Sequence, residues 1–103
     1  MSRESTLSDF LEVLGVVDGF TSGLLIDAGH LLVAVVSVAP YLVADRWVLA
    51  SDPLVDDLVL GLKGLFDQLV SSVDRGGRAP VMSSAREFNA GLRSAIKQLE
   101  AAL

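Results

Sequence analysis

Asp27 and His30 are the pair of side chains in this 103-residue sequence whose types and spacing suggest proton chemistry. They are three residues apart, so on a helix they lie one turn apart, where a carboxylate can orient an imidazole for general acid–base work. Catalysis would also need a nucleophile or a substrate handle, and Ser37 and Tyr41 are one or more turns further along. The polar seam of a helix is the commoner meaning of this pattern, so we expect no enzyme activity.

The residue types offer little support for a metal site or a phosphate-binding site. The chain has no Cys and a single His, which leaves a zinc or thiolate site without ligands. Asp56 and Asp57 are adjacent, so on a helix they point about 100° apart and make a poor pair of metal ligands. No glycine-rich segment has phosphate-binding spacing. We therefore expect no metal and no cofactor.

The composition indicates a protein that must cover apolar surface. Apolar residues make up 51% of the chain and charged residues 20%, where about a quarter is usual. The excess apolar surface needs a partner, which would be lipid, copies of the same chain or another helical subunit.

Charge is distributed unevenly along the chain. Up to Asp74, eleven acids face three bases, whereas from Arg75 onward five bases face two acids; the net charge is −5. The five bases are dispersed and lack interleaved aromatic residues, so we expect no nucleic-acid binding. The basic C-terminal segment is expected to dock on the acidic body in preference to lying on anionic lipid.

The chain is organised around residues 22–51, an apolar stretch that is uncharged over residues 28–44 apart from His30 when protonated. Its polar and small exceptions recur at steps of three or four residues and fall within roughly 80° on a helix, whereas on a strand they would share a face with many apolar residues. We therefore predict a long helix, kinked or broken near Pro40, and leave open two helices or a hairpin. The exceptions are Asp27, His30, Ala34, Ser37, Tyr41 and Asp45.

Amphipathic helices are predicted on both sides of this stretch. The first covers residues 6–18, with a capping box from Thr6 to Asp9. The third covers residues 53–74, with Asp52 as its cap and a proline at the first helical position, where the missing N–H costs nothing.

Residues 75–83 are rich in Gly and Pro and are predicted to be a flexible loop. A basic amphipathic helix is predicted to follow over residues 84–103, with a capping box from Ser84 to Glu87.

Each of the last two predicted helices has a stripe of apolar residues, called a seam here, and we predict that these residues form an interface. In the C-terminal helix these residues recur every three or four positions, which is typical of contact with a partner helix. Gly61 and Gly64, beside the other seam, either allow a close helix approach or are merely tolerated. The interface residues are Leu58, Leu62, Leu65, Leu69, Phe88, Leu92, Ile96 and Leu99.

Two stretches near the N-terminus resemble a known family. Residues 9–19, followed by residues 22–25, resemble the opening of the short acidic helical porins of mycolic-acid bacteria. The resemblance implies a helical oligomer in an outer membrane, without an ordinary signal peptide. It also implies a pore lined by the polar stripe, which consists of Asp27, His30, Ser37, Tyr41 and Asp45.

A second resemblance involves three blocks in order. Residues 6–9, 25–28 and 46–51 are similar to blocks of the gas-vesicle shell protein. That family folds as helix–strand–strand–helix, so the resemblance implies that the Val-rich centre is a hairpin turning near Pro40.

The sequence thus predicts an all-α chain of four helices in a single domain over residues 1–103, which works by assembly and not by catalysis. The leading hypothesis is a small helical membrane or envelope protein whose wide apolar face contacts lipid. If its polar stripe faces water, the protein forms a pore. The alternatives are a soluble, cytoplasmic obligate oligomer or accessory subunit that buries its apolar face on a partner, and a gas-vesicle-type shell subunit. No cleavable signal peptide is expected from the first residues, where acidic side chains interrupt the apolar pattern.

Overall fold

The computed structural model of the chain describes residues 2–23, 27–43 and 52–103. These residues form helices and contain no strand, which confirms the predicted all-α class with four helices. In chain order the elements are α1 (Arg3–Thr21), α2 (Ala28–Val38), the short 3-10 turn η1 (Pro40–Leu42), α3 (Pro53–Arg75) and α4 (Arg78–Ala101).

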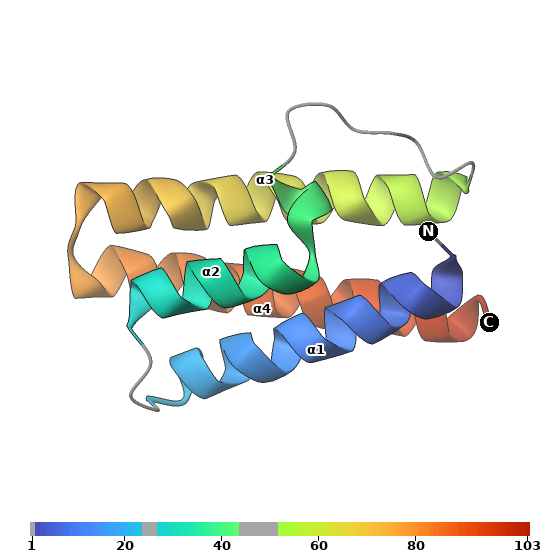
Figure 1. The fold of residues 1–103 in the computed structure, drawn as a ribbon, viewed down its shortest axis with the longest axis horizontal. Coiled ribbons are helices and arrows are strands. Elements are labelled where there is room, and N and C mark those ends of the chain that lie inside the picture. Colours follow the sequence, from blue (N-terminus) through green and yellow to red (C-terminus); the bar gives the residue numbers. More distant parts are fainter. Residues whose placement is uncertain (1, 24–26, 44–51) are drawn as a thin grey trace.

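Helix α4 packs against two other helices, α3 and α1 (Figure 1). Helices α3 and α4 are consecutive and run side by side in opposite directions, and α1 also packs along α4. Helix α2 packs against α1, and the turn η1 reaches α3. The start of α1 and the end of α4 consequently lie at the same end of the molecule (Figure 1).

All four helices contribute to one buried apolar cluster. On α3 and α4 the buried positions recur every three or four residues, as an apolar stripe that faces a neighbouring helix requires. The rings of Phe66 and Phe88 meet across these two helices with centroids 5.5 Å apart and planes tilted by 47°. The largest fully buried side chains are Phe10, Phe66, Phe88, Leu31, Leu42, Leu69, Leu92 and Leu99.

Helix α1 begins earlier and ends later than the sequence predicts. Its cap is Ser2, whose hydroxyl accepts the N–H of Ser5 at 3.0 Å, while the Ser5 hydroxyl accepts the N–H of Ser2. The predicted cap at Thr6 is wrong, because Thr6 is buried inside the helix and donates its hydroxyl to the Ser2 carbonyl. The helix continues past residue 18 because Phe20 packs into the core.

The long central helix is not confirmed. Helix α2 ends at Val38, and Ala39 adopts a non-helical conformation with φ −128° and ψ 67° before the turn at Pro40. Proline lacks an N–H and disfavours a helical conformation in the residue before it, so the helix stops there. The described part of the stretch over residues 28–38 is helical and not the strand that a hairpin would need. The predicted continuation over residues 44–50 lies outside the described residues.

The predicted start of α3 is confirmed. Asp52 caps the helix by accepting the N–H of Leu54, and Pro53 occupies the first helical position. Both features are local, which is why the sequence was sufficient to place this helix start.

The predicted flexible loop over residues 75–83 is wrong. Only Gly76 and Gly77 separate α3 from α4, and both have positive φ angles, of 76° and 100°, that favour glycine. Pro80 lies in the first turn of α4, where its missing N–H would have no acceptor within the helix. The predicted cap at Ser84 is therefore also wrong, since Ser84 lies well inside α4.

The close approach between α3 and α4 occurs at Gly91 and not at either of the glycines singled out in the sequence. An added Cβ at Gly91 would overlap the end of the Leu65 side chain. At Gly61 and Gly64, by contrast, nothing lies within 4 Å of where a Cβ would be, so these two glycines are not packing positions in the described structure.

Polar contacts tie α1 to the other helices near both of its ends. Arg3 donates to Asp52 at 2.7 Å and to the carbonyl of Ala102 at 3.1 Å, joining the start of α1 to the start of α3 and the end of α4. Asp18, near the other end of α1, accepts from Asn89 and Arg93 of α4 at 2.6 and 2.8 Å.

Candidate functional site

The Asp27–His30 pair predicted from the sequence forms at the start of α2. Asp27 caps the helix by accepting the backbone N–H of His30 at 2.8 Å, and its other oxygen lies 2.7 Å from Nδ1 of the His30 ring. The backbone hydrogen bond, and then the one from the ring, hold the pKa of the Asp27 carboxyl below its ordinary value. Both side chains are largely exposed, at 68% and 79%, so the pair is a solvated cap and not an enclosed acid–base site.

The remaining members of the polar stripe do not converge on this pair. The Ser37 hydroxyl donates to the carbonyl of Val33 in its own helix at 2.9 Å. Tyr41 lies beyond the end of α2 and donates to Asp9 of α1 at 3.1 Å; burial, and then the Asp9 charge, raise the pKa of the Tyr41 phenol. Asp45 lies outside the described residues. The described part of the stripe therefore offers no nucleophile beside His30.

The predicted interface residues pack within the chain. Six of them are buried and two, Leu58 and Leu65, are half-buried against the same core. The seam of the C-terminal helix meets other helices of the same chain, because α4 packs against both α3 and α1. The buried six are Leu62, Leu69, Phe88, Leu92, Ile96 and Leu99.

The outer face of α2 presents an apolar surface to solvent. Leu31 and Val35 point inward and are fully buried, whereas Val33 remains 66% exposed. Leu32, Val33, Val36 and Ser37 line a shallow, largely apolar groove on this face. The Ser37 donor is already used inside the helix, so this face offers mainly apolar contact.

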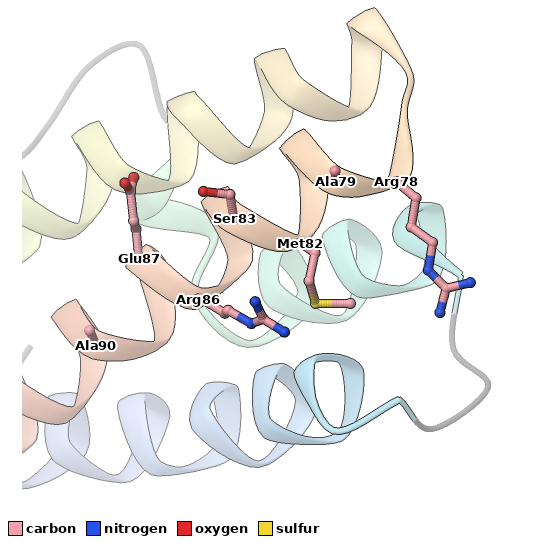
Figure 2. Close-up of a pocket in the computed structure, with 7 residues that line it drawn as sticks. All are labelled: Arg78, Ala79, Met82, Ser83, Arg86, Glu87 and Ala90. Carbon is pink, nitrogen blue, oxygen red and sulfur yellow. The ribbon is translucent and has the colours of Figure 1, made fainter.

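The outer face of α4 carries a second groove with a different character (Figure 2). Met82 lies between Arg78 and Arg86 at steps of four residues, and Figure 2 shows these three side chains directed to one side of the helix. Glu87 and Ser83 point toward the opposite edge, in the direction of α3. This groove was not predicted from the sequence, because Arg78 and Met82 fall in the segment that was predicted to be a loop. The four-residue spacing of Arg78, Met82 and Arg86 was the signal that could have found it.

Within residues 2–23, 27–43 and 52–103, no three His, Cys, Asp or Glu side chains cluster closely enough to hold a metal ion. Within the same ranges none of the helices has the length and apolar character required to span a membrane.

Comparisons of the chain with protein-family profiles, with curated proteins and with solved structures found no match.

Proposed function

We propose that this protein is a non-enzymatic helical assembly subunit whose copies associate through the outer face of α2. The observation that carries the proposal is the groove lined by Leu32, Val33, Val36 and Ser37, in which Val33 is 66% exposed. A fully buried Val contributes about 1.5–3 kcal/mol relative to an exposed one, so covering this face favours association.

The charge distribution favours a second copy as the occupant. The chain carries a net charge of −5, so most approaches between two copies bring acidic surfaces together. The groove on α2 contains no charged side chain, and an uncharged face can pair with itself across a two-fold axis without like-charge repulsion. In such a two-fold contact both copies bury the same apolar face, so the buried apolar area is twice that of one face.

Sedimentation velocity at increasing protein concentration tests this proposal. In about 0.5 M salt, where charge contacts are strongly screened, we expect the wild-type protein to associate. Val33→Glu should weaken that association about tenfold or more, because it places a charge in an apolar contact. Leu11→Glu is the matched control, since Leu11 is 48% exposed on α1, away from the groove.

A wild-type protein that stays monomeric at every concentration, or two variants that weaken association equally, would overturn the proposal. Vesicle flotation distinguishes contact between two copies from contact of the same face with lipid. If the monomeric wild-type protein binds vesicles and Val33→Glu does not, the outer face of α2 contacts lipid and not a second copy.

A further inference from the structure

The groove on α4 combines two cations with an apolar centre. Arg78 and Arg86 are eight residues apart, or about 12 Å along a helix, and Met82 lies midway between them. Neither arginine forms an ion pair with any part of the chain that the structure describes. Met82 is half-buried against the core and still lines the groove, and its flexible side chain between two cations suits an apolar side chain flanked by carboxylates.

The outer face of α3 offers the complementary pattern. Leu60 is 52% exposed, and Asp57 and Asp67 are exposed on the same side of the helix, ten residues or about 15 Å apart. Neither aspartate has an ion-pair partner among the described residues. Gly64, one turn beyond Leu60, leaves open space on this face for an approaching side chain.

We propose that the α4 groove of one copy receives the outer face of α3 of a second copy. Met82 then faces Leu60, while Arg78 and Arg86 reach Asp57 and Asp67. With Met82 opposite Leu60, one arginine and its aspartate are offset by about 1.5 Å along the helices and the other pair by about 4.5 Å, offsets that long arginine side chains can bridge. This inference rests on the proposed assembly function, but it concerns a contact separate from the one on α2.

The two contacts generate different assemblies. The α2 face pairs with itself, whereas the α4 groove binds a different surface, so this contact is head-to-tail and leads to rings or filaments. A second copy supplies both the two opposite charges and an apolar side chain between them. An anionic bilayer would supply charge alone, and it is therefore an outcome of the test.

Charge reversal in a Val33→Glu background tests the contact, because that background lacks the α2 association. In about 0.02 M salt, where charge contacts are weakly screened, we expect this parent to self-associate. Adding either Arg78→Glu with Arg86→Glu, or Asp57→Arg with Asp67→Arg, should weaken association about tenfold or more. An equimolar mixture of the two charge-reversed proteins should restore it, because the opposite charges again meet.

Two controls complete this experiment. Arg75→Glu with Lys97→Glu makes the same change in net charge at exposed positions outside the groove and should leave association unchanged. Circular dichroism should show an unchanged helical spectrum in every variant, since all the substituted side chains are exposed.

Either of two results overturns this inference without touching the α2 proposal. The first is a parent that is monomeric in low salt although wild-type protein associates in high salt. The second is a mixture of the reversed proteins that stays monomeric. If the parent instead binds only phosphatidylserine vesicles and the arginine reversal abolishes this, the groove contacts anionic lipid.

Discussion

Gly91 on α4 lies so close to Leu65 on α3 that a methyl group at position 91 would overlap the end of the leucine side chain. Gly61 and Gly64 on α3 have no such neighbour. The same residue type therefore has two roles in one helix pair, and stability measurements can separate them.

We expect Gly61→Ala and Gly64→Ala each to raise the free energy of unfolding by about 0.5–1 kcal/mol, because alanine is the better helix former and the added methyl group meets open space. Gly91→Ala should raise the free energy of unfolding by clearly less than this, or lower it, because Leu65 must rotate to make room for the added methyl group. Urea unfolding followed by circular dichroism measures all three. Equal gains at the three positions would show that the helices do not approach closely at Gly91.

The ion pair between Arg3 and Asp52 should make stability depend on pH. The Arg3 hydrogen bond, and then its charge, lower the pKa of Asp52 below its ordinary value of 3.8. A carboxyl with a lowered pKa stabilises the fold above its ordinary pKa and loses that contribution as the pH falls through the folded-state value. Asp52→Asn should therefore lower the melting temperature at neutral pH, and the difference from wild type should shrink below about pH 3.8.

Asp57→Asn is the matched control for that experiment, because Asp57 is exposed on the same helix and has no ion-pair partner among the described residues. It should leave the melting temperature nearly unchanged at neutral pH. A difference between Asp52→Asn and wild type that stays constant with pH would contradict the role given to the ion pair.

The hydroxyls of Ser72 and Ser84 meet at 2.7 Å across α3 and α4, and Ser72 is only 3% exposed. Replacing either residue by Ala should lower the free energy of unfolding by about 1 kcal/mol, because the hydrogen bond between the two hydroxyls is lost. The double variant should lose less than the sum of the two, since the bond can be lost only once. Ser83→Ala, at an exposed neighbouring position, should change stability by less than about 0.5 kcal/mol. Strict additivity would argue against the contact.

Two valines on α2 test which face of this helix packs inward. Val35 is fully buried and Val33 is 66% exposed. Val35→Ala should cost about 2 kcal/mol of stability, from lost burial and the cavity left behind, whereas Val33→Ala should change it by less than about 0.5 kcal/mol. Thermal unfolding in high salt at a concentration where the protein is monomeric gives the comparison. A larger loss at Val33 would mean that the inner and outer faces are reversed.

Local signals in the sequence were sufficient wherever the structure is decided within a few residues. Asp52 before Pro53 correctly placed the start of α3, because a cap and a first-position proline act through the backbone of one turn. The Asp27–His30 contact was predicted for the same reason, as both residues lie on one helical turn. The all-α class followed from apolar residues that recur every three or four positions.

Local signals failed where two structures are compatible with the same residues. Gly76, Gly77 and Pro80 suggested a loop, but two glycines are enough to turn the chain, and a proline fits the first turn of a helix. At the N-terminus a serine pair, Ser2 and Ser5, provides the cap, although Thr6 had the more familiar spacing to an acidic residue.

The sequence alone determined which residues are helical over most of the chain and that each helix has an apolar side. It could not determine what covers those sides, because periodicity specifies a face and not the surface that meets it. Only the tertiary structure showed that the seams of α3 and α4 cover each other and that Leu31 and Val35 complete the same core. The same packing leaves Val33 and Leu60 on outer faces and Met82 half-buried at the edge of the core, since a helix packed against neighbours on one side must expose the other.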